Sequence, residues 1–281
     1  MGYKTIDVKQ VAGALGAEIF GADLSADLDN ETFDDIHQAF LDHQVVFFRD
    51  QQISPDQHVA FGRRFGTLNI HPYVKGMANH PEIMEIVKEP GEKLNFGGGW
   101  HSDMSFLEEP ALGSVLYGRD IPDFGGDTLF ASQYAAYDAL SDGMKDLLDG
   151  LNAIHTAKQE YGRVGNSSRK RQSMEVEEVE GEVPEFAHPV IRTHPETGRK
   201  ALYVNQAFTE KFVGMTRRES KPLLGFLCAH ATREEFTCRF RWSNDAIAFW
   251  DNRCVQHFAL NDYQGRRRHM QRVTVNGDLP Q

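Results

Sequence analysis

Cysteine is scarce in this sequence, which has only Cys228, Cys238 and Cys254 among its 281 residues. The number is odd, and no two cysteines show the CxxC spacing of a zinc ribbon or a redox motif. Neither a disulfide-stapled secreted domain nor a cysteine-ligated zinc fold fits this usage. We therefore expect a reduced protein of the cytoplasm.

Long apolar runs are also missing, because no stretch approaches the roughly 18 residues that a membrane-spanning helix needs. The first residues, MGYKTIDVKQVAG, lack the apolar core of a signal peptide. Positive charge is in deficit, with 30 Lys and Arg against 41 Asp and Glu and a net charge of −11. Such a surface repels polyphosphate, so we expect neither a membrane nor a nucleic-acid partner.

The chain is instead rich in short segments of strand character, separated by Gly, Pro, Asn or Asp. Hydrophobic residues make up 40% and charged residues 25%, which is ordinary globular usage. Helical patterns occur near residues 30–41, 54–65, 132–150 and 216–230, with Asn30 and Ser54 as the expected caps of the first two. The strand candidates are 45–48, 83–88, 114–117, 128–130, 190–193, 202–204, 236–242, 246–250 and 272–275.

No alternation of strand, helix and strand occurs along the chain, which argues against a doubly wound sheet. The sequence predicts a single domain over residues 1–281, mainly β with peripheral helices, built as an antiparallel sandwich or barrel. A polar insertion at about residues 158–185 contains the run SSRKR followed by MEVEEVEGEVPE. This segment could be either a solvated surface insertion or a mobile lid. In both cases we expect it to be mobile when no substrate is bound.

A histidine followed two residues later by a carboxylate occurs three times in this chain, at His80, His101 and His194. Proline separates the pair at His80 and at His194, and proline interrupts a strand, so these two pairs indicate turns. A serine separates His101 from Asp103, and on a strand both side chains would point to the same face. His101 and Asp103 are therefore candidate metal ligands.

His257 is the candidate for a third ligand, although an ordinary buried histidine is the alternative at this position. Two histidines and one carboxylate with open positions suit non-haem Fe(II), which must also bind a cosubstrate and oxygen. A zinc or manganese hydrolase can use the same triad. A non-catalytic binding protein is the third possibility.

A basic run, Gly265–Val273, stands near the end of this acidic chain. If its second half is a strand, Arg268 and Arg272 share one face. Two inward arginines are costly unless each meets an anion. Because arginine binds carboxylates through paired hydrogen bonds, these two residues fit an oxo acid and an acidic substrate.

Further motifs cover almost the whole chain. In order, they are Gly13-Ala-Leu-Gly-Ala-Glu-Ile, Gly21-Ala-Asp-Leu, His43-Gln-Val-Val-Phe-Phe-Arg-Asp50, WHSDMSF at 100–106, Gly125-Gly-Asp-Thr128, His188-Pro-Val, Thr193-His-Pro-Glu-Thr-Gly198, Trp250-Asp-Asn-Arg253, and the segments His257–Tyr263 and Arg268–Arg272. Together they resemble the taurine and dichlorophenoxyacetate dioxygenase family of Fe(II)/2-oxoglutarate enzymes.

This resemblance implies a double-stranded β-helix (jelly roll), with Fe(II) as cofactor and with 2-oxoglutarate and O2 as cosubstrates. Decarboxylation of 2-oxoglutarate to succinate would accompany hydroxylation of a substrate carbon. The matching positions are His101, Asp103 and His257 for the metal, Thr128 and Arg268 for 2-oxoglutarate, and His71, Phe208 and Arg272 for the substrate.

Two departures from the taurine branch bear on the substrate. Gly97 stands where that branch has an asparagine. Tyr73 follows His71 one residue earlier than the corresponding tyrosine of that branch. The segments 155–158 and 219–224 look more like the phenoxypropionate branch. We therefore expect a small anionic organic substrate with a longer or aromatic body, such as an aryloxyalkanoate, sulfonate, alkyl sulfate or phosphonate, and a homo-oligomeric enzyme.

Overall fold

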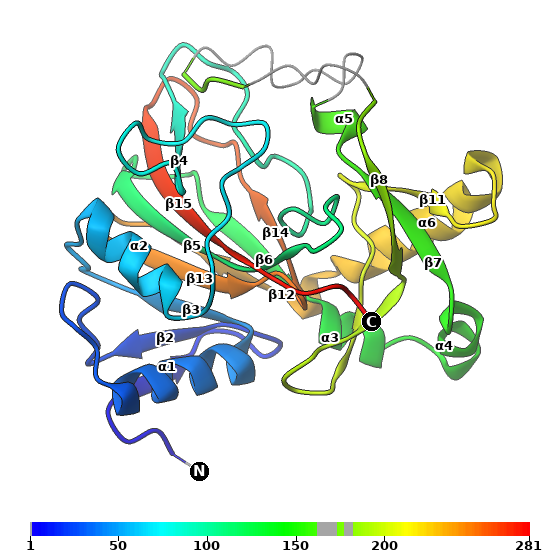
Figure 1. Cartoon of the computed structure of the whole chain (residues 1–281), viewed down its shortest axis with the longest axis horizontal. Helices are drawn as coiled ribbons and strands as arrows, with labels where there is room; N and C mark the ends of the chain where they lie inside the picture. The colour runs from blue at the N-terminus through cyan, green and yellow to red at the C-terminus, as the bar shows by residue number, and fades with distance from the viewer. Residues whose placement is uncertain (1, 162–172, 177–181) are drawn as a thin grey trace.

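The protein is built mainly of β-strands, and the computed structural model describes residues 2–161, 173–176 and 182–281 (Figure 1). Its largest sheet has seven strands. In spatial order they are β1 (Asp7–Gln10), β2 (Ala17–Phe20), β3 (Val45–Phe48), β13 (Ile247–Asp251), β5 (Ala111–Asp120), β15 (Arg268–Asn276) and β4 (Ile83–Lys88). All neighbours are antiparallel except β2 and β3, which run parallel.

A second, antiparallel sheet faces the first and has the order β12 (Thr237–Phe240), β6 (Thr128–Ser132) and β14 (Val255–Ala259). Apolar side chains from both sheets meet in one buried cluster. Phe47 of β3 stacks on Phe240 of β12 with ring centroids 4.1 Å apart, and Phe130 of β6 packs 5.5 Å from Trp250 of β13. This two-layer arrangement is the predicted jelly roll.

The outer face of the large sheet is covered by α1 (Asn30–His43) and α2 (Pro55–Arg63) (Figure 1). Along β13, Ala248 and Trp250 belong to the inner cluster, whereas Ile247 and Phe249 belong to the outer one. This is the two-residue alternation of a strand that is buried on both faces. Phe249 stacks on Phe40 of α1 with centroids 4.1 Å apart.

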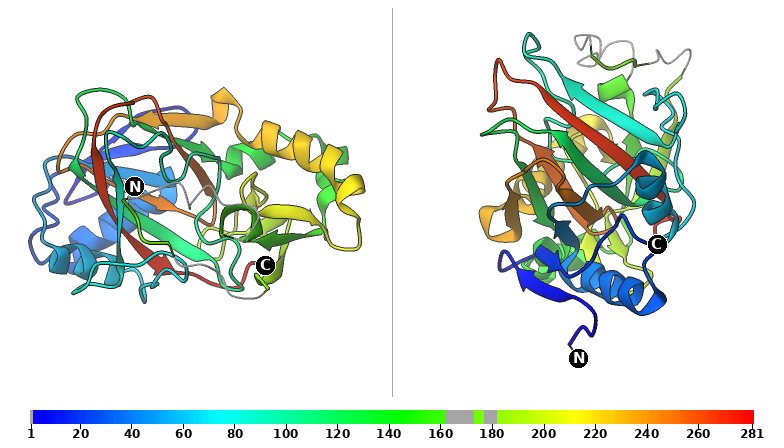
Figure 2. Two further views of the ribbon diagram at one scale, coloured as in Figure 1. Left: turned by 90° about the horizontal axis from the view of Figure 1, so that it is seen from above. Right: turned by 90° about the vertical axis from the view of Figure 1, so that its left-hand side faces the viewer.

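A smaller lobe extends from the jelly roll and lies at the opposite end from the amino-terminal elements (Figures 1 and 2). Its strands are β11 (Thr209–Phe212), β7 (Asn152–Thr156) and β8 (Glu185–Pro189) in one sheet, and β10 (Lys200–Leu202) and β9 (Ile191–Thr193) in another. Its helices are α3 (Gln133–Asp138), α4 (Asp142–Leu148), α5 (Lys158–Tyr161) and α6 (Arg217–Ala231). Apolar residues of α3, α4, α6 and of strands β7, β9, β10 and β11 form a separate buried cluster.

Several local predictions need correction. The first helix is capped by Asp29, whose carboxylate accepts from Thr32 N at 2.8 Å, and not by Asn30. The helical pattern predicted over 132–150 forms two helices, α3 and α4. The side chain of Ser141 accepts a hydrogen bond from Met144 N and so caps the start of the second helix. Strand β14, which carries His257, was not predicted.

Much of the polar insertion predicted at 158–185 lies outside the described residues, namely 162–172 and 177–181. The described part includes α5 and the single bridge between Val74 and Val176. No helix in the described ranges is long and apolar enough to cross a membrane.

Candidate active site

His101, Asp103 and His257 lie together in the structure, with one potential ligand atom of each within 4.8 Å of the others. His101 and His257 form an antiparallel bridge, in which His257 N donates to His101 O at 2.8 Å and His101 N donates to His257 O at 3.2 Å. The strand argument for Asp103 was wrong, because only His101 pairs and Asp103 begins a turn. Met104 in that turn has φ of 60°. The turn brings the carboxylate to the same place.

The protonation states of these side chains suit a divalent cation. His101 Nδ1 donates to Gly99 O at 2.7 Å, and the other ring nitrogen, Nε2, lies 3.6 Å from Asp103 Oδ1. Burial, and then the nearby His101, hold the pKa of His257 well below its usual range. Burial alone would raise the pKa of Asp103, but Arg272, followed by His257, lowers it well below the ordinary value. A neutral His257 and an ionised Asp103 therefore lie beside His101, which is the form in which imidazole and carboxylate bind a metal ion.

Arg272 meets an anion that the sequence did not indicate. Its Nη1 donates to Asp103 Oδ1 at 2.6 Å, and both side chains are only 4% exposed. Its Nε is buried without a hydrogen-bond partner in the described part of the chain. Arg272 is thus paired on one side and retains a donor on the other.

A small cavity next to His257 contains the residues predicted to bind the oxo acid. Thr128, Arg268 and His257 line it, together with the apolar Ile86 and Leu116. Arg268 is buried, and its Nε and Nη2 have no hydrogen-bond partner among the described residues.

Trp242 connects the two polar residues of this small cavity. Its Nε1 donates to Thr128 Oγ1 at 2.9 Å, and its ring lies 5.9 Å from the guanidinium carbon of Arg268. Because the threonine oxygen accepts that bond, its own proton is available to a ligand. A buried cation with unused donors beside a hydroxyl fits a carboxylate.

A larger cavity of about 300 Å³ opens on the other side of His101. His71, Arg272 and Phe208 line it, so all three predicted substrate residues face one space. The ring of Phe208 stands edge-on to that of His101 at 5.9 Å. The other apolar lining residues are Leu94, Phe96, Met104, Phe106, Ala207 and Phe258.

His71 presents a fixed tautomer to this cavity. Its Nδ1 accepts from the backbone N–H groups of Tyr73 and Val74, both at 3.1 Å. Burial, with a smaller effect from the charge of Arg272, lowers the pKa of His71 to about 3. The ring is therefore neutral, and its Nε2 carries the proton and acts as the donor.

Gly97 lines both cavities, as do Phe96, His101 and Arg272. Its φ of 74° is a left-handed conformation that favours glycine. A Cβ at this position would lie 3.4 Å from His101 Cε1 and 3.8 Å from Ala259 Cβ. A side chain here would therefore occupy space directly beside the first candidate ligand.

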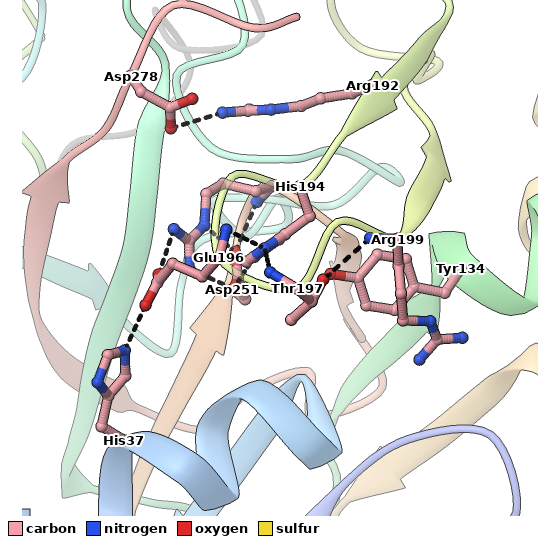
Figure 3. A network of polar contacts seen from close by, with 10 residues as sticks. His37, Tyr134, Arg192, His194, Glu196, Thr197, Arg199, Asp251 and Asp278 are labelled. Carbon is pink, nitrogen blue, oxygen red and sulfur yellow. Dashed lines mark hydrogen bonds and ion pairs between the residues drawn. The ribbon is translucent and has the colours of Figure 1, made fainter. Parts of the chain in front are cut away.

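A second metal-like cluster consists of His194, Asp251 and Cys254. Its histidine and carboxylate belong to a network of polar contacts (Figure 3). His194 Nε2 lies 2.9 Å from Asp251 Oδ2, and Arg253 donates to both oxygens of Asp251 at 2.8 and 2.7 Å. Backbone N–H groups of the following turn donate to His194 Nδ1. Arg253 holds both oxygens of this carboxylate, and both ring nitrogens of His194 have partners, so the cluster is structural, as the proline between His194 and Glu196 predicted.

Comparison with known proteins gives a consistent result. Residues 7–274 match the family described as taurine catabolism dioxygenase TauD, TfdA family. The chain is 35% identical over 277 residues to an alpha-ketoglutarate-dependent sulfate ester dioxygenase of Pseudomonas putida, covering 98% of this chain and 91% of that protein. It is 34% identical over 282 residues to an alkylsulfatase of Acinetobacter baylyi, covering 98% and 86%. A crystal structure of a taurine dioxygenase from Burkholderia xenovorans superposes with a TM-score of 0.83 at 37% identity, covering 99% and 91%.

Proposed function

The chain belongs to the TauD, TfdA family and is an Fe(II)- and 2-oxoglutarate-dependent dioxygenase, and from this premise we propose that it oxidises alkyl sulfate esters. The buried Arg268, whose unused donors lie beside Thr128 in a cavity that reaches His101 and His257, supports the use of 2-oxoglutarate. The observation that carries the substrate proposal is the larger, mainly apolar cavity, which Arg272 and His71 also line. The family match and the relative named as a sulfate ester dioxygenase also favour the dioxygenase over the zinc or manganese hydrolase.

His101, Asp103 and His257 would hold the iron. The donor set of two imidazoles and one carboxylate suits Fe(II) and leaves positions open. When bound, iron with 2-oxoglutarate and O2 supplies the oxidation that converts a substrate C–H to C–OH, releasing succinate and CO2. The backbone bridge between His101 and His257 places the two residues side by side, with ring centroids 4.2 Å apart.

Thr128 and Arg268 would bind the distal carboxylate of 2-oxoglutarate. The guanidinium and the hydroxyl would supply the donors, and the apolar Ile86 and Leu116, which line the same cavity, would contact the methylene carbons. This arrangement orients the oxo acid end of the molecule towards His101 and His257.

Arg272 and His71 would bind the sulfate group of the substrate, since both present N–H donors to the larger cavity. Phe208 and the other apolar lining residues would contact the alkyl chain. Hydroxylation of the carbon that bears the sulfate ester gives an unstable product, which separates into an aldehyde, sulfate and a proton. The bond that breaks is the C–O bond of the ester.

A succinate-release screen tests this function. Purified enzyme with Fe(II) and 2-oxoglutarate is offered alkyl sulfates, sulfonates, phosphonates and aryloxyalkanoates, and products are read by mass spectrometry. We expect alkyl sulfates to give succinate and aldehyde in equal amounts. Succinate formation only with aryloxyalkanoates would overturn the substrate assignment, and no succinate with any acid would overturn the activity.

We further propose that the chain acts as a single cytoplasmic domain in a homo-oligomer. The three cysteines are free, which suits a reducing compartment. Exposed apolar side chains such as Phe226 and Val213, at 49% and 48% exposure, offer contacts between copies. Sedimentation velocity would give the assembly, and a monomer at micromolar concentration would contradict it.

A further inference from the structure

A chain of buried hydrogen bonds runs from Trp250 to the carboxylate of Asp103. Trp250 Nε1 donates to Asn252 Oδ1 at 2.9 Å, and Asn252 Nδ2 donates to Ser114 Oγ at 3.0 Å. Ser114 Oγ then donates to Asp103 Oδ2 at 2.7 Å. Trp250, Asn252 and Ser114 are all fully buried.

In this chain of hydrogen bonds, hereafter the relay, Trp250 and Asn252 determine which group donates at each step. Asn252 Oδ1 receives the indole N–H of Trp250 and also the backbone N–H of Asp103, at 3.0 Å. Both of these groups only donate, so the amide atom that they meet must be oxygen. The amide nitrogen must then face Ser114, and since it only donates, the serine proton has to point to Asp103.

The relay distinguishes the two oxygens of Asp103. Oδ2 is held by Ser114, whereas Oδ1 lies 3.6 Å from His101 Nε2 and accepts from Arg272. Oδ1 is therefore the oxygen that lies beside His101 Nε2, while Oδ2 is engaged by the serine. The ring of Trp250 also packs 4.5 Å from that of His257, so the residue that begins the relay supports a second candidate ligand.

We propose that Ser114 and Asn252 are positioning residues that present Asp103 to the metal through Oδ1 alone and thereby set the affinity of the site. This inference rests on the proposed role of Asp103 as a ligand. A carboxylate free to rotate could bind with both oxygens and occupy a position that 2-oxoglutarate or oxygen requires. Loss of a group that orients a ligand typically weakens metal binding by about 10- to 100-fold.

Valine and threonine at position 114 provide the sharpest test, because they have the same shape and differ in the hydroxyl. Mn(II) alone is titrated into the metal-free full chain by calorimetry, and thermal unfolding of each metal-free variant is recorded in parallel. We expect Ser114→Thr to bind Mn(II) close to wild type and Ser114→Val to bind about 10- to 100-fold more weakly.

Two further variants complete the design. Ser220→Ala removes a fully buried serine of α6 that bonds Thr216 O and Phe212 N, so it should lower stability without changing Mn(II) affinity. Asn252→Ala removes the donor that orients the hydroxyl, and it should weaken Mn(II) binding even if Ser114→Val fails to fold. Equal Mn(II) affinity in the valine and threonine variants, or in Asn252→Ala and wild type, would overturn the proposal.

The proposed function fails in a different way. In that case wild type itself would bind no Mn(II), or His101→Ala would bind it as tightly as wild type. Wild-type binding that is lost in His101→Ala but unchanged in Ser114→Val would leave the metal site standing and reject only the positioning role.

Discussion

Arg268 and Arg272 lie on the same inner face of β15 but differ in what they meet. Arg272 is neutralised by Asp103 at 2.6 Å. Arg268 has two buried nitrogens without a partner in the described ranges, and burial lowers its pKa. Burying an unpaired guanidinium is costly, so Arg268 is the residue whose environment improves most when an anion binds.

Replacement of Arg268 by alanine should raise the concentration of 2-oxoglutarate required for half-maximal succinate release. A hydrogen bond to a charged group contributes about 1.5–3 kcal/mol, which corresponds to roughly 10- to 150-fold. The neighbouring Arg267 pairs at the surface with Glu89 and Asp120, so Arg267→Ala is the matched control and should leave that requirement unchanged. An equal effect of both substitutions would indicate a general change of charge.

His71 should influence substrate binding without titrating near neutrality. Its pKa of about 3 means that the ring is neutral above that value and gains a charge only in strong acid. We expect His71→Ala to weaken substrate binding by about 0.5–1.5 kcal/mol, roughly 2- to 13-fold, while the pH profile between about pH 5 and 8 keeps its shape. The measurement is kcat/KM against pH for both proteins. A step near pH 6.5 that is present only in wild type would show that His71 is protonated on binding.

At the scale of elements, the loop before His101 sets the space around the metal site. Gly97 has φ of 74°, and asparagine tolerates this region better than most residues. We expect Gly97→Asn to fold and to fill space beside His101, where a Cβ already lies 3.4 Å from Cε1.

The Gly97→Asn variant should therefore discriminate against long substrates. Its kcat/KM for a long alkyl sulfate should fall by about 10-fold or more, since a misplacement of about 1 Å costs up to 100-fold, while its activity on a short sulfonate should change less. A uniform loss on both substrates would instead indicate distortion of His101.

The turn between β13 and β14 is held by the ion-pair network of Figure 3. Glu196 accepts from Arg253 Nη1 at 2.7 Å and lies 2.9 Å from His37 Nε2 of α1. The hydrogen bond from His37, which outweighs the opposing effect of burial, and the guanidinium of Arg253 lower the pKa of Glu196 to about 2. The depressed pKa stabilises the fold above the ordinary value of 4.5, and this contribution is lost as the pH falls from 4.5 towards 2.

In the Glu196→Gln variant, the free energy of unfolding should therefore depend less on pH between about 4.5 and 2 than in wild type. The side chain is 34% exposed and screened by solvent, so we expect a difference of at most about 1 kcal/mol at neutral pH that vanishes near pH 2. Urea unfolding of both proteins at a series of pH values measures it. A difference that persists unchanged in acid would mean that packing, and not charge, accounts for the contribution of Glu196.

The sequence predicted helices and strands correctly where a hydrophobic pattern is bounded by clear capping or turn residues. The strand at 83–88 was predicted with its actual bounds, and Ser54 with Pro55 began a helix as expected. Strand β14 was missed because Val255–Ala259 mixes apolar residues with Gln256 and His257, and its pairing with β6 depends on residues more than a hundred positions away. Local patterns contain no information about such contacts.

At the scale of the whole molecule, the jelly roll supplies the candidate ligands and the smaller lobe supplies part of the pocket wall. Arg272 comes from β15 and His257 from β14, whereas Ala207 and Phe208 precede β11 of the lobe. The predicted set of eight site residues was identified by motif and resemblance, and the structure brings all eight to two adjoining cavities. The pairing of Arg272 with Asp103 and the hydrogen bonds through Ser114 could not be foreseen, because both depend on how the turns that contain Asp103 and Asn252 pack against β5 and β15.

The most direct test of the account is an anaerobic titration of the metal-free protein with Fe(II) and 2-oxoglutarate, followed by absorbance. We predict one Fe(II) per chain, and an additional absorption band when 2-oxoglutarate binds the iron-loaded protein. The band should be absent from His257→Ala and should require far more 2-oxoglutarate in Arg268→Ala. Iron binding in His257→Ala that equals wild type, or no response of the iron-loaded protein to 2-oxoglutarate, would contradict the assignment of this site.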